Sequence, residues 1–268
     1  MLNGLYGLSY NPFDKHANSY KNGFKSNDFQ QMISRLNHIK DVRGVGLFTA
    51  LPGFGKTFAL HCFTESINPS LYQTAYICLT SVSVTEFYRQ FCNALNIDSS
   101  AHRTTMFKAI QERLYYLFKE KRRPFILAID EAHEMDPRSL KDIKMILNHA
   151  YDSLYCFTLL LIGEPRLNEI LSGSVHEALR QRITIHYNFT GLSEDETAAY
   201  INHKLSAAGG CASILDNGVS CAVHGFSQGN PRLIDNVMSD ALTIGAQHNK
   251  KIIDTDIILY AVENQSLL

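Results

Sequence analysis

The sequence predicts an α/β fold in which a five-stranded parallel sheet lies between helices and is followed by a small all-helical domain. Two observations support this prediction. Continuous apolar, β-prone runs alternate with helical runs up to about residue 191, and the strands then stop. The expected strands cover residues 45–49, 74–80, 124–131, 157–163 and 183–189. The expected divisions are an N-terminal arm over 1–26, an α/β domain over 27–191 and a helical lid over 192–268.

Apolar residues at helical spacing predict the helices. The first begins at Asn27 and runs to Lys40, after a turn-rich arm with aromatic anchors. Further helices in the α/β domain are expected from Thr57 to about residue 68 and over 84–95, 104–121, 137–151 and about 175–182. The lid is expected to contain helices over about 193–207, 214–225, 231–247 and 254–264, the first of them with a capping box of Ser193 and Glu196.

Composition narrows the class of protein. The 268 residues are 45% hydrophobic, enough to bury a real core, and the net charge of −1 gives no general attraction to nucleic acid. No apolar run approaches the roughly 18 to 20 residues that span a membrane, and the N-terminus has no leader pattern, so we expect a cytoplasmic protein without a membrane segment. The six cysteines include no C-x-x-C pair, which disfavours zinc and disulfides.

The stretch ALPGFGKT at residues 50–57 follows the first expected strand and has the pattern of a P-loop. In a P-loop, backbone N–H groups surround nucleotide phosphates, the Lys reaches the β- and γ-phosphates, and the Ser or Thr hydroxyl binds Mg²⁺. The first glycine of the usual motif is Ala50 here, a tolerable change because the later glycines make the turn. The residues expected to bind ATP in this segment are Ala50, Pro52, Gly53, Phe54, Gly55, Lys56, Thr57 and Phe58.

A second motif ends the third expected strand, where Asp130 and Glu131 follow an apolar run. This is the Walker B pattern. We expect Asp130 to hold Mg²⁺ together with Thr57, and Glu131 to polarise the water that attacks the γ-phosphate. Two solvated surface acids would be the alternative, but an acidic pair at the end of a core strand is costly without a cation.

The spacing of the two motifs selects among P-loop proteins. Lys56 and Asp130 lie 74 positions apart, which leaves room for an inserted strand. An inserted strand together with a Glu beside the Walker Asp favours the AAA+, RecA-like and helicase ATPases over GTPases and small kinases. Residues 130–133 also spell DEAH, but helicases with that motif need a second RecA-like domain, and too few residues follow the fifth strand.

With these motifs and the Gly-Asn-Pro-Arg of residues 229–232, the sequence resembles an AAA+ ATPase. The resemblance implies an AAA+ P-loop fold with strand order 5-1-4-3-2 and a helical lid. It also implies that Arg232 is a sensor 2 arginine that binds the γ-phosphate, a task suited to a permanently charged guanidinium. Glu164 lies at the sensor 1 position, where an amide or hydroxyl is commoner than a carboxylate.

More narrowly, four segments resemble the ExeA-type ATPases: YGLSYNPF at 6–13, IDEAH at 129–133, LIGEPRL at 161–167 and LRQRI at 179–183. That group includes general-secretion ATPases and stand-alone transposition ATPases related to TniB, TnsC and Mu B. Arg180 and Arg182 precede the fifth strand, where AAA+ proteins place an arginine finger that completes a neighbour's active site. The resemblance therefore implies an oligomer, with Arg182 the better match, although an exposed basic helix end is the alternative.

Two functions follow from the resemblance. The first is an ATPase that regulates DNA transposition: with ATP it oligomerises on duplex DNA, selects a target and recruits a transposase, and hydrolysis resets it. We place it first because the sequence ends shortly after the lid, without the membrane and cell-wall-binding segments usual in secretion members. The alternative is a secretion or assembly ATPase with a protein client and no DNA. A basic cluster at Lys119, Lys121, Arg122 and Arg123 is explained as well by a helix C-terminus as by nucleic acid.

Overall fold

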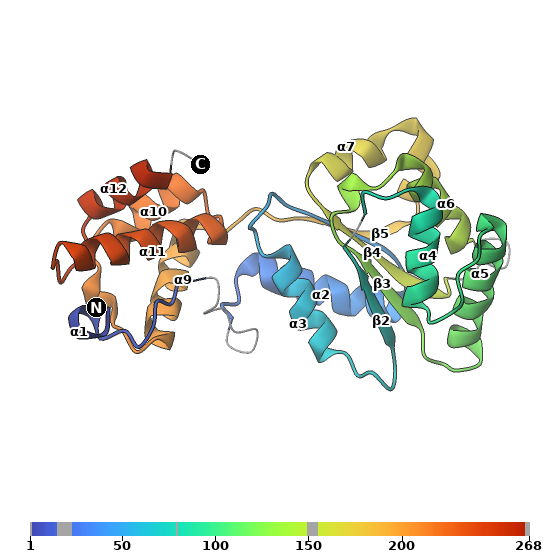
Figure 1. Ribbon diagram of the computed structural model, residues 1–268, viewed down its shortest axis with the longest axis horizontal. Helices are drawn as coiled ribbons and strands as arrows, with labels where there is room; N and C mark the ends of the chain where they lie inside the picture. Colours follow the sequence, from blue (N-terminus) through green and yellow to red (C-terminus); the bar gives the residue numbers. More distant parts are fainter. Residues whose placement is uncertain (1, 15–22, 79, 149–154, 266–268) are drawn as a thin grey trace. The chain divides into compact units, whose positions relative to one another are not determined.

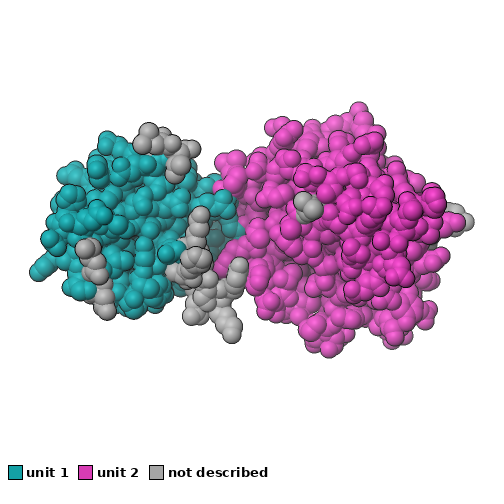
Figure 2. All heavy atoms as spheres, viewed as in Figure 1, with its two compact units in different colours: residues 1–30, 53–55, 190–268 teal, residues 31–52, 56–189 magenta. Residues whose placement is uncertain are grey.

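The computed structural model describes residues 2–14, 23–78, 80–148 and 155–265. The chain forms two compact units (Figure 2). Unit 1 contains residues 1–30, 53–55 and 190–268, and unit 2 contains residues 31–52 and 56–189. The N-terminal residues thus cluster with the helical part of the chain, and the predicted boundaries at 26/27 and 191/192 remain predictions.

Unit 2 is built on a five-stranded parallel sheet. Its order is β2-β3-β4-β1-β5, which confirms the predicted order 5-1-4-3-2. β1, β3 and β4 are buried throughout, as expected for central strands covered on both faces, whereas β2 and β5 at the edges are only partly buried. The strands are β1 (Gly44–Thr49), β2 (Gln73–Ile77), β3 (Phe125–Ile129), β4 (Phe157–Gly163) and β5 (Ile183–Asn188).

Helices cover both faces of this sheet (Figure 1). One hydrophobic cluster joins alternate residues of β1, β3 and β4 to α4, α5 and α6. The opposite face packs against α2. At Gly46 in β1 the packing is so close that an added Cβ would lie 3.2 Å from the side chains of both Ile39, in α2, and Leu160. The helices are α2 (Asn27–Val42), α3 (Lys56–Ser66), α4 (Val84–Ala94), α5 (Arg103–Lys119), α6 (Pro137–Leu147), α7 (Arg166–Ser172) and α8 (Glu177–Arg180), with short 3₁₀ helices η2 (Ala132–Glu134) and η3 (Ser174–His176).

Several elements of unit 2 differ from the sequence-based expectations. The α7 helix was not predicted, and it begins directly after Pro165, a residue that favours helix starts. The helix expected at 175–182 consists of η3 and the four-residue α8. β3 ends at Ile129 because Glu131 adopts a left-handed backbone with φ 51°. α6 ends at Leu147, and part of its predicted C-terminal extension lies outside the described residues.

Unit 1 is helical, with its own apolar core. The Ser193–Glu196 capping box forms as predicted. α10 begins five residues later than expected, after Gly218 with φ 92°, and a short helix occupies the start of the arm. The helices are α1 (Leu2–Tyr6), α9 (Glu194–Ala207), η4 (Ala212–Ile214), α10 (Val219–Ser227), α11 (Pro231–Gln247) and α12 (Thr255–Gln265). Within the described ranges, no helix has the length and apolarity required to cross a membrane.

Candidate nucleotide site

The loop between β1 and α3 has the backbone that phosphate binding requires. Gly53 and Gly55 both have φ 89°, a conformation that side-chain-bearing residues rarely adopt. Lys56 is the first residue of α3, and its buried Nζ donates to the carbonyl oxygens of Ala50 at 2.7 Å and Leu51 at 3.2 Å. The ammonium is therefore folded back over the loop, at the positive end of a helix. Both features fit a loop that surrounds phosphate groups.

The two predicted Mg²⁺ ligands meet beside this loop. Thr57 Oγ1 donates to Asp130 Oδ2 at 2.9 Å. The Asp130 carboxylate accepts two further hydrogen bonds, from Tyr76 Oη to Oδ2 at 2.9 Å and from Glu131 N–H to Oδ1 at 3.0 Å. Hydroxyl and carboxylate oxygens are ligands that Mg²⁺ prefers, so these residues fit the ion that the P-loop implies.

Tyr76 is a residue that the sequence analysis missed. It lies in β2, which pairs with β3, and this pairing brings its hydroxyl to Asp130. Burial, together with the hydrogen bond to Asp130, raises the pKa of Tyr76 well above its ordinary value. The phenol therefore remains a donor to Asp130 throughout the physiological pH range.

Glu131 extends from the end of β3 with half of its side chain exposed. Its left-handed backbone turns the chain sharply after the strand, and Thr80 Oγ1 donates to the Glu131 carbonyl oxygen at 2.9 Å. The strand end thus fixes the Glu131 backbone while its carboxylate stays accessible. A general base needs this combination of a fixed origin and access to water.

A buried imidazole links Glu131 to Glu164. His133 lies in η2, with Nδ1 3.4 Å from Glu131 Oε2 and Nε2 3.9 Å from Glu164 Oε2. Glu131, His133 and Glu164 offer ligand atoms that all lie within 4.8 Å of one another, close enough to hold a metal ion. Sequence reasoning recorded His133 only as part of the DEAH letters and gave it no role.

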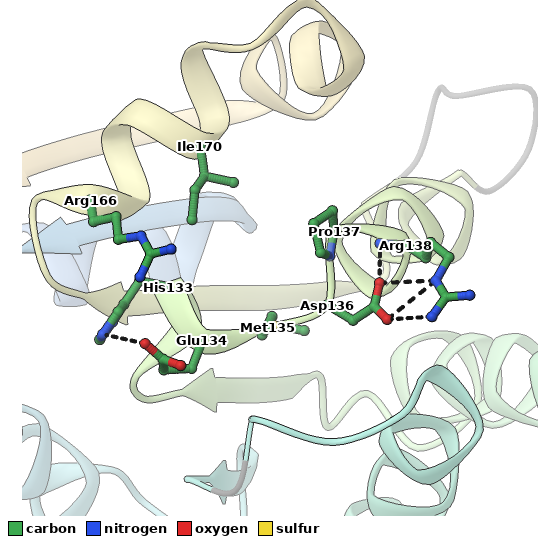
Figure 3. Close-up of a pocket in the computed structure, with 8 residues that line it drawn as sticks. All are labelled: His133, Glu134, Met135, Asp136, Pro137, Arg138, Arg166 and Ile170. Carbon is green, nitrogen blue, oxygen red and sulfur yellow. Dashed lines mark hydrogen bonds and ion pairs between the residues drawn. The ribbon is translucent and has the colours of Figure 1, made fainter.

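Figure 3 shows the pocket beside this group. It has a volume of about 620 Å³ and is lined mainly by the segment after β3 and by α7. His133 and Glu134 stand at one end, and the ion pair between Asp136 and Arg138 stands at the other. The lining residues are His133, Glu134, Met135, Asp136, Pro137, Arg138, Arg166 and Ile170.

The side-chain amide of Asn168 lies at the ends of β1 and β5. Asn168, in α7, donates from Nδ2 to Thr49 Oγ1 at 3.0 Å and to Asn188 Oδ1 at 3.1 Å. These partners are the last residues of β1 and β5. Asn168 is thus an amide near the position where sequence reasoning found the unusual Glu164. Its role could not be inferred because α7 was not predicted.

The two candidate arginine fingers differ in accessibility. Arg182 is buried, and its guanidinium donates to the Lys144 carbonyl oxygen at 3.3 Å. Arg180 is exposed and donates to the carbonyl oxygens of Leu171 at 3.1 Å and Ser172 at 2.7 Å. A finger must reach a neighbouring subunit, so exposure favours Arg180, whereas motif position favours Arg182.

Arg232 is exposed near the start of α11, after Pro231 at the first helical position. The Asn230 side chain caps this helix by accepting a hydrogen bond from the Arg232 N–H at 3.0 Å. The Gly-Asn-Pro-Arg motif therefore encodes a helix start. Arg232 belongs to unit 1, whereas Lys56 and Asp130 belong to unit 2, and its contact with ATP remains a prediction.

Comparison with known proteins supports the predicted fold. A family model described as an AAA domain matches residues 39–171. One similar solved structure is Cdc6p from Pyrobaculum aerophilum, with a TM-score of 0.64 and 15% identity, covering 90% of this chain and 67% of that one. Another is the Aeropyrum pernix ORC1 protein in complex with DNA, with a TM-score of 0.64 and 14% identity, covering 94% of this chain and 68% of that one. The RuvB Holliday junction branch migration motor of Thermotoga maritima is also similar, with a TM-score of 0.59 and 17% identity, covering 91% of this chain and 73% of that one.

A curated relative adds detail. General secretion pathway protein A of Aeromonas hydrophila is 29% identical over 267 residues, which cover 98% of this chain and 48% of that protein. The chain thus spans about half the length of the relative. This similarity agrees with the ExeA-type resemblance, and it does not show the predicted relationship to the transposition ATPases. The chain has the fold of the AAA+ P-loop ATPases, matches a family model described as an AAA domain over residues 39–171, and is similar to General secretion pathway protein A.

Proposed function

We propose that this protein binds ATP with Mg²⁺, hydrolyses it, and uses the cycle to assemble or rearrange a protein client, as an ATPase of the ExeA type. The observation that carries the proposal is the contact between the Thr57 hydroxyl and the Asp130 carboxylate, with Glu131 exposed on the next residue. The protein client is suggested by the relative, whose name refers to general secretion.

Each residue has a separate task in this proposal. Lys56 and the glycine-rich loop bind the phosphates, and Thr57 and Asp130 hold Mg²⁺. The ion neutralises charge on the phosphate oxygens when bound. Glu131 accepts a proton from the attacking water. The Tyr76 phenol keeps Asp130 oriented through its hydrogen bond.

An oligomer completes the site in this proposal. Arg180 from one subunit would enter the site of the next and stabilise charge in the transition state, an effect that can be worth about 10³- to 10⁵-fold in rate. Its exposure is the reason for preferring it to Arg182. The guanidinium would exchange its bonds to the Leu171 and Ser172 carbonyl oxygens for bonds to phosphate.

Regulation of DNA transposition on duplex DNA, with a transposase as partner, is the second candidate. One observation favours a DNA contact: Lys119, Lys121 and Arg122 are exposed at the end of α5. The exposed ring of Tyr116 lies in the same helix, 5.6 Å from Lys121 Nζ. Basic and aromatic side chains together suit nucleic acid.

Binding to a fluorescent, sequence-neutral DNA duplex at one fixed salt concentration separates the two candidates. The comparison is between no nucleotide, ADP and a slowly hydrolysed ATP analogue, with salt fixed because phosphate contacts are steeply salt-dependent. We expect the protein to bind both nucleotides but not the DNA duplex, whichever nucleotide is present or absent. This result would support a protein client. Tight DNA binding only with the ATP analogue would instead favour the transposition function.

Lys56→Ala is the control for the nucleotide. Removing the ammonium should abolish tight ATP binding while leaving the fold intact, as judged by thermal melting. If the variant binds the analogue as well as the wild type does, the P-loop assignment and the proposed function both fail.

A further inference from the structure

The geometry points to His133 as a positioning residue, which holds the Glu131 carboxylate in place for ATP hydrolysis and couples it to the end of β4. This inference rests on the proposed function, because it concerns the same base. Half of the Glu131 side chain is exposed, and a carboxylate on a flexible stem needs a contact to fix its direction. The contact found here is His133 Nδ1, 3.4 Å from Glu131 Oε2.

The imidazole is itself firmly held. Only 7% of the His133 side chain is exposed, and its backbone lies in η2, directly after the left-handed turn at Glu131. The ring packs against Gly163, the last residue of β4. A Cβ there would lie 3.2 Å from His133 Nδ1 and 3.3 Å from His133 N, closer than ordinary van der Waals contact. The glycine therefore allows the ring to lie against the strand end.

One ring nitrogen has two competing partners. The Glu164 N–H donates to His133 Nδ1 at 3.3 Å, and the Glu131 carboxylate lies 3.4 Å from the same atom. With a proton on Nδ1, the ring can donate to Glu131; without it, Nδ1 accepts from the Glu164 N–H. Nδ1 therefore cannot donate to Glu131 and accept from the Glu164 N–H at the same time. A shift of the backbone at Glu164 would therefore change how firmly Glu131 is held.

The other nitrogen, Nε2, is directed at the Glu134 carboxylate (Figure 3). His133 Nε2 lies 3.4 Å from Glu134 Oε1 and 3.9 Å from Glu164 Oε2, and Arg166 lines the same pocket as His133. Carboxylates thus stand near both nitrogens of the ring. A sensor 1 role does not explain the negative charge of Glu164, whereas a contact with His133 does. The Glu164 N–H and the Glu131 carboxylate also lie near the same nitrogen of the ring.

Three substitutions of His133 test this inference in steady-state ATP hydrolysis. Asn places a polar atom near the position of Nδ1, Gln places one near Nε2, and Ala places neither. We expect kcat to fall about 10- to 100-fold in His133→Ala and His133→Gln, because a misplaced base loses its geometry, with KM for ATP within about twofold of wild type. His133→Asn should retain kcat within about threefold. His102→Asn, an exposed histidine at the start of α5, is the matched control.

Thermal melting and binding of the ATP analogue keep folding separate from positioning. The inference is overturned if all three variants keep wild-type kcat, if His133→Asn loses as much kcat as His133→Ala, or if only KM changes. Glu131→Gln measured in parallel tests the proposed function itself. Should Glu131→Gln hydrolyse ATP at the wild-type rate, the role of Glu131 fails; should it be inactive while the His133 variants are normal, only the role of His133 fails.

Discussion

Two carboxylate clusters, one in each unit, differ in how completely their polar groups are enclosed. In unit 1, Lys204 Nζ lies 2.8 Å from both oxygens of Asp235, and Tyr200 Oη donates to Asp235 Oδ1 at 2.9 Å. The Lys204 and Asp235 side chains are only 10% and 15% exposed. In unit 2, Asp130 is equally enclosed, but its neighbours Tyr76 and Glu131 are about half exposed. The first cluster is closed, and the second opens to solvent.

Electrostatics explains what each arrangement is suited for. Burial raises the pKa of Asp235 and lowers the pKa of Lys204, and their mutual attraction opposes both shifts. Such a pair is costly to break and offers no group to a ligand. The Asp130 cluster instead places a buried carboxylate between two residues that are each about half exposed, Tyr76 and Glu131. We infer that the closed cluster supports the helical fold and the open one supports chemistry.

Asp235→Asn should have the largest effect on stability. It leaves the Lys204 ammonium buried without a counter-charge, a situation that costs about 3–5 kcal/mol. Urea unfolding followed by circular dichroism measures the change. As a control, the double substitution Lys204→Met and Asp235→Leu removes both charges and should recover most of the loss. A single variant within about 1 kcal/mol of wild type would contradict the structural role of this pair.

Glu131→Gln, in the Asp130 cluster, should lower activity and leave stability unchanged. Losing the general base should slow ATP hydrolysis at least about 100-fold, or about 2.7 kcal/mol in activation free energy, while ATP binding is kept. The melting temperature should not fall, since the side chain is half exposed. Glu112→Gln, an exposed carboxylate of α5, is the matched control and should hydrolyse ATP normally.

Mixing extends the same experiment to the oligomer. Arg180→Ala lacks the proposed finger but keeps its own base, whereas Glu131→Gln lacks the base but keeps the finger. If the finger acts between subunits, mixtures of the two inactive proteins should regain part of the activity. The same mixture made with Arg182→Ala decides between the two arginines. Absence of rescue with both would argue against an intersubunit site.

Sequence reasoning identified the residues whose chemistry requires a fixed local spacing. Lys56, Thr57, Asp130 and Glu131 follow apolar strands, and the strand order confirms the predicted fold. Their predicted roles still await the experiments above. His133 was missed although it is part of the DEAH letters, because strand order alone does not show that the turn after β3 brings its imidazole to Glu164 at the end of β4.

Residues that depend on tertiary packing were harder to predict. The predicted strand order places β2 beside β3, but it does not fix the register of the two strands, and the donation from Tyr76 to Asp130 depends on that register. Asn168 belongs to α7, a helix of only seven residues that was not predicted from the spacing of apolar residues. Burial likewise separates the exposed Arg180 from the buried Arg182, although the sequence motif favours Arg182. Such relations come from contacts between elements.

The smallest effect is expected at His176, a buried imidazole in unit 2 that forms no ion pair with the described residues, unlike Lys204 and Asp235 in unit 1. Its imidazole is buried, and Nδ1 has no hydrogen-bond partner among the described residues. Burial, with a smaller contribution from Lys141, lowers the pKa of His176 below its usual value near 6.5. The unfolded chain therefore takes up this proton more readily than the fold, so stability is full above about pH 6.5 and declines as pH falls through the lowered pKa. His176→Leu removes this proton uptake, and its melting temperature should fall less than that of wild type between pH 7 and pH 5, roughly the range in which histidine titrates. If the melting temperature of the variant falls as much as that of wild type or more, other groups control the loss of stability in acid. Burial of His176 then costs far less free energy than burial of an unpaired charge at the Asp235 site.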